Sequence, residues 1–168
     1  MKKLYMIGLI LCVALTGFNV QAQNKQIQKA LQFEAVKKLF YSGNFMIDIT
    51  YATPSGGQGV SLFSNRGDLR VKNDSVNAYI PYFGKSYSSA YGDESGAVEF
   101  RNQKFVASDA KINEKKKQII WKFEPTERNN KYQFTVFISS SGSCSITVIS
   151  SNKSQISYTG ALMPLNTK

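Results

Sequence analysis

The 168-residue sequence contains no histidine and only two cysteines, Cys12 and Cys144. Histidine is the commonest general base in enzymes and the commonest metal ligand, so its absence excludes Ser-His-Asp and Cys-His catalytic arrangements. So few thiols, without an imidazole, also leave zinc and copper sites without plausible ligands. We therefore expect a protein with no metal site, no cofactor and no catalytic residues of these kinds.

The sequence also lacks an apolar run of the roughly 18–20 residues that a membrane-spanning helix needs. Its longest run, Leu4 to Phe18, is about 15 residues long and follows the basic pair Lys2-Lys3. Val20-Gln21-Ala22 then places small residues at the −3 and −1 positions of a cleavage site. This pattern predicts a signal peptide over residues 1–22, with Gln23 as the new N-terminus; an uncleaved anchor is the alternative.

Cleavage at this position would leave the mature chain without a disulfide. Cys12 would leave with the signal peptide, and Cys144 would then have no intrachain partner. Residues 23–168 are enough for a single domain that buries most of its apolar surface. The predicted domain must therefore be stabilised by its core alone.

Acidic residues are scarce relative to basic ones: 11 Asp and Glu stand against 21 Lys and Arg, for a net charge of +10. The basic residues are dispersed, except for Lys115-Lys116-Lys117. A solvated basic surface is one interpretation, and an anionic partner such as envelope phosphates, an acidic glycan or another anionic polymer is the other. We do not expect nucleic acid as a partner of an exported protein.

The pattern of apolar residues predicts a helix followed by many short strands. Residues 24–41 contain no Gly or Pro, although their apolar residues share no single face, and we expect a helix that docks on the remainder, bending or fraying midway. Alternation with a period of two then predicts eight or nine strands joined by short turns. These strands cover residues 45–51, 60–64, 69–72, 76–80, 105–112, 119–124, 132–138, 144–148 and 156–162.

Short connections between strands favour antiparallel neighbours, and closure removes exposed edges. We therefore predict a mainly β fold, an antiparallel up-and-down barrel or barrel-like sandwich, lipocalin-like, with an N-terminal helix. In the first strand, Phe45, Ile47, Ile49 and Tyr51 share the predicted inner face. Cys144 is in phase with the apolar residues of its strand, which predicts a buried thiol.

One segment, Tyr79 to Gly92, combines aromatic residues with Gly, Ser and Pro. Aromatic rings on a loop either stack on a ligand or cover the mouth of the sheet as an apolar plug. We predict that the segment forms the rim of a ligand site and that two further aromatic residues lie in the barrel interior. The candidate ligand-binding residues are Tyr79, Tyr82, Phe83, Tyr87, Tyr91, Trp121 and Phe134.

Carboxylates are the remaining residues that could support hydrolysis, since a glycosidase needs only two of them facing each other across a cleft. The candidates are Asp93 with Glu94, Glu99, and Glu124 with Glu127. Their sequence context is that of solvated turns and strand ends, so no catalytic residue is predicted. A carboxylate-based hydrolase is the least favoured of the functions considered.

The aromatic block and the end of the chain resemble an uncharacterised protein family. The block Tyr-x-Pro-Tyr-Phe-Gly…Tyr…Tyr-Gly is matched by Tyr79 to Gly92. The ending, Tyr132 to Gly160, is an aromatic strand, a Ser/Gly turn, an Ile/Val strand and Ser-Asn-x-x-x-Ile-Ser-Tyr-x-Gly. On these motifs the chain resembles small exported Bacteroidetes-type proteins, described only as a domain of unknown function, over roughly residues 30 to 162. The resemblance implies a Gram-negative envelope protein and supplies no catalytic or binding residue.

Two functions therefore stay open. The first is a non-enzymatic exported binding module, periplasmic or secreted, for a small, partly apolar ligand held by the aromatic block. The second is a structural or interaction protein of the cell envelope that contacts a protein or a glycan. We expect no transmembrane segment to remain after signal cleavage.

Overall fold

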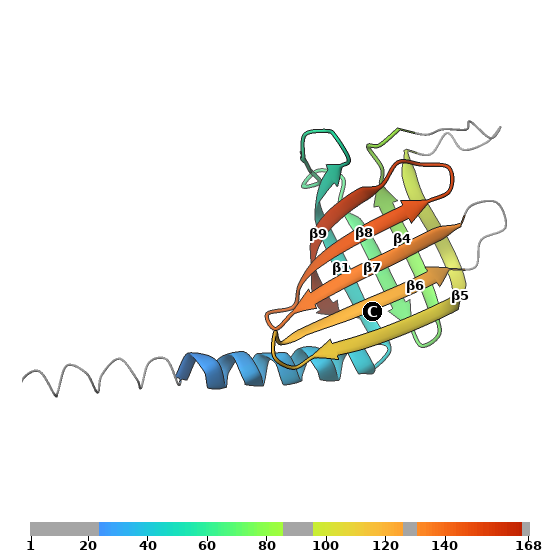
Figure 1. The fold of residues 1–168 in the computed structure, drawn as a ribbon. Helices are drawn as coiled ribbons and strands as arrows, with labels where there is room; N and C mark the ends of the chain where they lie inside the picture. The colour runs from blue at the N-terminus through green and yellow to red at the C-terminus, as the bar shows by residue number, and fades with distance from the viewer. Residues whose placement is uncertain (1–23, 86–95, 126–130, 166–168) are drawn as a thin grey trace, which may run out of the picture.

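A computed structural model describes residues 24–85, 96–125 and 131–165, which form one helix and nine strands (Figure 1). The predicted signal peptide lies outside these residues. The helix spans residues 24–41, and the strands are β1 (Asn44–Pro54), β2 (Val60–Ser61), β3 (Gly67–Lys72), β4 (Ser75–Pro81), β5 (Ala97–Asn113), β6 (Gln118–Pro125), β7 (Tyr132–Ser139), β8 (Ser143–Ser150) and β9 (Ile156–Pro164).

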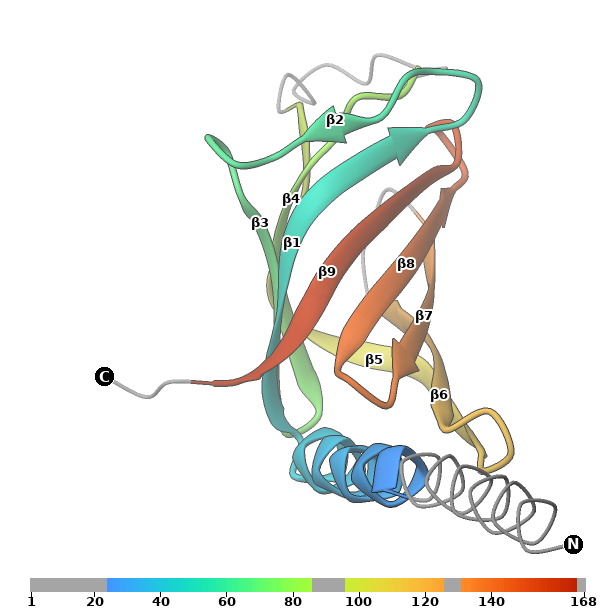
Figure 2. The ribbon, with the colours of Figure 1, turned by 90° about the vertical axis from the view of Figure 1, so that its left-hand side faces the viewer.

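Eight of the described strands close into an antiparallel barrel. The order along the sheet is β1-β3-β4-β5-β6-β7-β8-β9, and β9 pairs back onto β1 (Figure 2). The two-residue strand β2 adds only a short pairing, to the end of β1. The predicted antiparallel barrel with an N-terminal helix is confirmed, because every pairing between neighbouring barrel strands is antiparallel.

The helix lies across one end of the barrel (Figure 1). Phe33 and Phe40 are buried against the strands, and Gly43, at φ 66°, adopts the left-handed conformation that turns the chain into β1. Ile27 and Leu31 remain exposed because the first turns of the helix extend beyond the barrel. The scattered apolar pattern of the sequence thus reflects a helix of which only the second half has a barrel beneath it.

The barrel interior contains a chain of aromatic rings in contact with one another. The Trp121 and Phe123 rings stack with centroids 4.1 Å apart, and the Phe123 and Phe134 rings stack at 4.7 Å. Around them most of the rings meet edge to face, an arrangement that aromatic quadrupoles favour. The chain of contacts runs through Phe40, Phe45, Trp121, Phe105, Phe123, Phe134, Phe100 and Tyr132.

The phase of β1 changes partway along the strand. Phe45 and Ile47 are buried as predicted, but Tyr51 is 42% exposed and Ala52 is fully buried in its place. The pairing register with β9 shifts between Ile49 and Tyr51, and one extra residue in a strand reverses which face the following side chains occupy. The prediction that Tyr51 faces inward is therefore wrong.

Cys144 lies on the inner face of β8, as its phase in the sequence predicts. Its thiol is buried and donates a hydrogen bond to the Gly142 carbonyl oxygen at 3.4 Å. Burial raises the pKa of the Cys144 thiol from 9.0 to about 12, because the thiolate would lose its hydration.

This raised pKa predicts a pH-dependent contribution to stability. The protonated thiol contributes fully below about pH 9, and its contribution is lost as the pH rises toward 12, since the unfolded chain releases the proton first. We expect Cys144→Ala to cost about 2 kcal/mol less at pH 10.5 than at pH 8 in urea unfolding. Wild type and Cys144→Ala share all other titrating groups, so the difference between their unfolding free energies at each pH reports the Cys144 thiol alone. An equal cost of the substitution at both pH values would contradict the prediction.

Candidate functional site

The predicted ligand-binding residues occupy two separate parts of the barrel. Tyr79 lies on β4 and is 41% exposed, and Tyr82 and Phe83 follow directly after that strand. Trp121 and Phe134 are buried in the ring chain, and no ring contact among the described residues joins them to Tyr82 or Phe83. Two other predicted residues, Tyr87 and Tyr91, lie outside the described part of the chain.

Trp121 belongs to the end of the barrel that the helix covers. Its ring centroid lies 5.6 Å from that of Phe40 on the helix, and its Nε1–H donates to the Ser108 hydroxyl at 3.0 Å. This hydrogen bond satisfies the only polar atom of the indole. Trp121 is therefore part of the packed core, as is Phe134. The remaining candidate residues among those described lie at the opposite end of the barrel, where β4 ends.

At that opposite end, Tyr82 is held by a compact set of hydrogen bonds. Its hydroxyl lies 2.9 Å from the carbonyl oxygen and the hydroxyl of Ser154, and 3.0 Å from the Lys85 carbonyl oxygen. The Lys85 amide donates to the Ser154 hydroxyl at 2.9 Å, and the Ser154 amide donates to the Lys85 carbonyl at 2.8 Å. The segment after β4 is thereby fixed to the segment before β9.

Tyr158 and Lys153 complete this end of the barrel. The Tyr158 hydroxyl donates to the Pro81 carbonyl oxygen at 3.0 Å, and burial, with Tyr82 and Tyr132 nearby, raises the pKa of that hydroxyl. The Lys153 ammonium lies 5.2 Å from the Tyr82 ring centroid, within range of a cation–π interaction, and the residue is only 6% exposed. We call the set Tyr82, Phe83, Lys153, Ser154 and Tyr158 the tyrosine rim.

The tyrosine rim brings together the two sequence blocks on which the family resemblance rests. Pro81, Tyr82 and Phe83 come from the aromatic block, whereas Ser154 and Tyr158 come from the ending. Within the rim, Phe83 is 45% exposed, so an apolar ring faces solvent beside a fixed polar network. The rim thus combines one exposed apolar ring with hydroxyl and carbonyl groups that are already hydrogen-bonded to one another.

A shallow trough of about 420 Å³ lies on the outer face of the sheet. Phe123 and Phe134 are buried, so their neighbours along each strand point outward and form the walls of the trough. The Gln133 side-chain amide donates to the Glu124 carboxylate at 2.9 Å. The lining consists of Ala107–Asp109, Lys122–Glu124, Gln133–Thr135 and Ile149.

Two of the carboxylates considered for hydrolysis, Glu99 and Glu124, lie in the described part of the chain. Glu124 lies in the trough, and Glu99 forms an ion pair with Arg101 at 2.7 Å on the outside of β5. The other three, Asp93, Glu94 and Glu127, lie outside the described residues. Over residues 24–85, 96–125 and 131–165, no group of three or more His, Cys, Asp or Glu residues is placed to hold a metal ion.

A second hollow, of about 440 Å³, lies between the helix and the turn that joins β5 to β6, and three of its lining residues are lysines. Lys117 is held there by Glu114, with Nζ–Oε2 of 3.0 Å, and lies 5.7 Å from the centre of the Phe33 ring. We call this hollow the lysine groove; its lining residues are Gln26, Lys29, Ala30, Lys115 and Lys117.

Comparison with known proteins places the chain in a family. A family model described as a domain of unknown function, DUF4251, matches residues 27–162. The chain belongs to the DUF4251 family. The resemblance predicted from the aromatic block and the ending is thereby confirmed.

A solved structure supports the DUF4251 fold. The crystal structure of a DUF4251 family protein from Bacteroides eggerthii has a TM-score of 0.60 to this chain at 14% identity, covering 84% of this chain and 93% of the other. At this identity the similarity concerns the fold alone. A search of curated proteins found no match. Among the described residues of this DUF4251 chain, no helix is long and apolar enough to cross a membrane.

Sequence reasoning did not select Lys153, Ser154 or Tyr158 as site residues. They are separated from Tyr82 by about 70 positions, and only the pairing of β9 with β1 and β8 brings them to the end of β4. The Ser-Asn-x-x-x-Ile-Ser-Tyr-x-Gly ending was the available signal for Tyr158, but Lys153 and Ser154 occupy its unspecified positions.

Proposed function

We propose that this DUF4251 protein is a non-enzymatic binding module for a small, partly apolar molecule, acting in the periplasm or after secretion. The observation that supports the proposal is the tyrosine rim, where two distant segments meet and leave the Phe83 ring facing solvent. A ligand would stack on Phe83 and form hydrogen bonds to the polar groups around Tyr82.

The rim is suited to binding because its polar groups are already held in place. The hydrogen bonds between Tyr82, Lys85 and Ser154 restrict both segments before a ligand arrives. Preorganisation of this kind lowers the entropy lost on binding. The exposed ring supplies the apolar contact, so a ligand with one apolar face and one polar edge matches the site.

Native mass spectrometry of the protein purified from its own host tests this proposal. We expect a fraction of the molecules to carry a defined small-molecule mass that disappears on denaturation. In Phe83→Ala this bound fraction should be at least about tenfold lower, since a stacked ring contributes on the order of 1–3 kcal/mol to the free energy of binding.

Phe63→Ala provides the matched control, because Phe63 is another exposed phenylalanine, 81% exposed against 45% for Phe83, and lies outside the rim. It should retain the bound mass. Absence of any bound mass in the native preparation, or its persistence in Phe83→Ala, would contradict the proposal.

A second candidate function, interaction with an acidic glycan or another anionic polymer of the envelope, is favoured by the lysine groove. Lys29 and Lys115 line the groove, and Lys116 lies next to them in the turn. A polymeric partner that is released by salt, in place of a defined small mass, would favour this function in the same preparation.

A further inference from the structure

None of the described strands lies beside the second half of β5 along one of its two edges. β5 pairs with β4 only as far as Lys104 and with β6 only from Phe105 to Asn113. The last backbone hydrogen bond on the β4 side is donated by the Phe105 amide to the Asp74 carbonyl, at 3.4 Å. In the part of the chain that the structure describes, residues 106–113 pair with no strand on that side.

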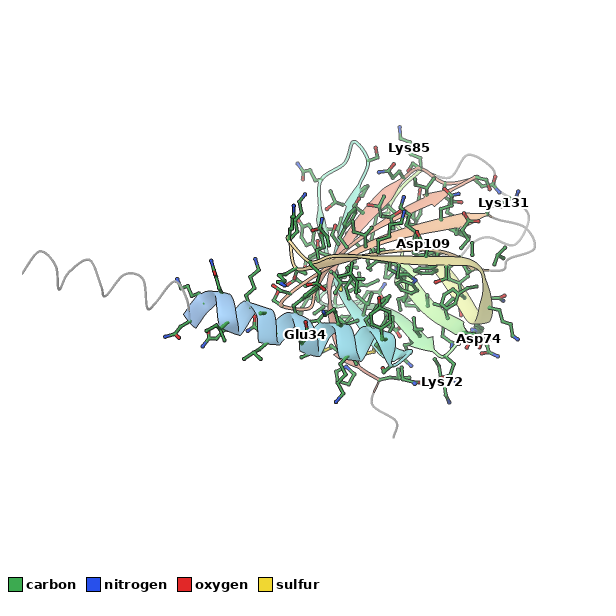
Figure 3. All side chains as sticks on the ribbon, turned by 60° about the horizontal axis from the view of Figure 1, so that its bottom comes forward. Glu34, Lys72, Asp74, Lys85, Asp109 and Lys131 are labelled. Carbon is green, nitrogen blue, oxygen red and sulfur yellow. The ribbon has the colours of Figure 1, made fainter. Side chains whose placement is uncertain are left out.

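Exposure along this half-strand agrees with a free edge. Every residue from Val106 to Ile112 is exposed, although Ser108, Ala110 and Ile112 pair with buried residues of β6 and therefore share the inner face. In a strand covered on one side, exposure alternates from residue to residue. Figure 3 views this end of the molecule, with Asp109 on β5 and Glu34 on the helix.

The charges along this edge of β5 are complementary to the charges on the same edge of a second copy of the protein. Asp109 and Lys111 lie on the same face of β5, with Nζ–Oδ2 of 3.7 Å. In an antiparallel pair centred on Ala110, Asp109 of each copy would lie opposite Lys111 of the other. Opposite charges directly across two strands stabilise their pairing, and like charges destabilise it.

We propose that two copies of this protein associate through the free edge of β5, forming an antiparallel β5–β5 ladder about a two-fold axis at Ala110. This arrangement gives hydrogen-bond partners to the backbone groups along the edge of β5 that no described strand of the barrel pairs with. It goes beyond ligand binding, because the edge lies toward the end that the helix covers and the tyrosine rim lies at the other end.

Charge selects this register from its neighbours. A ladder centred on residue 109 would oppose two aspartates, and one centred on residue 111 would oppose two lysines. Centring on Ala110 instead forms two cross-strand ion pairs and places two small alanine side chains on the axis. Because both copies use the same edge, the association closes at a dimer and cannot extend into a fibre.

Sedimentation equilibrium of wild type, Asp109→Lys and Lys111→Asp tests the proposal. Wild type should be dimeric at the upper end of a concentration series reaching about 100 µM. Each single variant opposes like charges twice in its own dimer, and we expect its dimer dissociation constant to rise at least about tenfold. Lys115→Asp, an equal charge change in the adjacent turn, should leave the dimer unchanged.

An equimolar mixture of Asp109→Lys and Lys111→Asp provides the decisive measurement. Each copy then meets opposite charges on the other, so the mixture should dimerise again, which also shows that both variants are folded. A monomeric wild type over the whole series, single variants that dimerise like wild type, or a mixture that stays monomeric would each overturn the proposal. Edge pairing with a different protein would give the first of these results.

Discussion

Phe123→Ala is expected to lower the free energy of unfolding by about 3–5 kcal/mol. Phe123 is 2% exposed and lies at the centre of the ring chain, with ring centroids 4.1 Å from Trp121, 4.7 Å from Phe134 and 5.4 Å from Phe105. Truncation would leave a cavity among rings that are too rigid to fill it. Such a loss is a large part of the 5–15 kcal/mol that typically stabilises a domain.

Urea unfolding measures this effect, and Phe63→Ala is its control. The same atoms are removed in both variants, but Phe63 is 81% exposed, so its truncation should change stability by no more than about 0.5 kcal/mol. The slope of the transition should stay constant between the two variants. If both substitutions lowered the free energy of unfolding by similar amounts, packing of Phe123 in the ring chain would contribute no more to stability than an exposed phenylalanine does.

Gly160→Ala is expected to destabilise the protein by about 3 kcal/mol, at the upper end of the cost of overpacking. Gly160 lies opposite Ile49, where β9 closes the barrel against β1. A methyl group at this position would overlap the Asp48 carbonyl oxygen and lie 3.2 Å from the Ile49 Cα. These are backbone atoms held by the closing ladder, so they cannot move aside without weakening the barrel closure.

Gly96→Ala provides the matched comparison, measured by the same thermal or urea unfolding. A Cβ added at Gly96 meets nothing within 4 Å, so this substitution should be neutral or slightly stabilising. A Gly160→Ala variant as stable as Gly96→Ala would mean that β1 and β9 can separate locally at no cost. That result would contradict the close approach at the closing ladder.

Much of the core was predictable because burial in a strand follows a period of two. Ile119, Trp121 and Phe123 alternate with polar or half-buried neighbours, and all three are buried. The prediction failed where the backbone inserts an extra residue. At Tyr51 the register shift reverses the face, and in β5 the shifts near Phe100 and Phe105 interrupt the alternation, so the predicted strand, residues 105–112, missed its beginning at Ala97.

The candidate site was predictable only in part. The aromatic block identified Tyr82 and Phe83 because its composition differs from that of the surrounding strands. It could not identify Lys153 or Ser154, since a lysine and a serine in a turn carry no local signal of their own. Their role depends on the 2.9 Å contacts to Tyr82, which exist only after the barrel has closed.

The sequence by itself determined the helix, the strand segments and the face that most strands bury, because these follow from local backbone preference and apolar periodicity. Only the tertiary structure decided which distant residues meet in the tyrosine rim and which half of β5 pairs with a single one of the described strands. Both depend on the offsets between paired strands around the closed barrel. These offsets are set by packing of the whole interior, and no single segment encodes them.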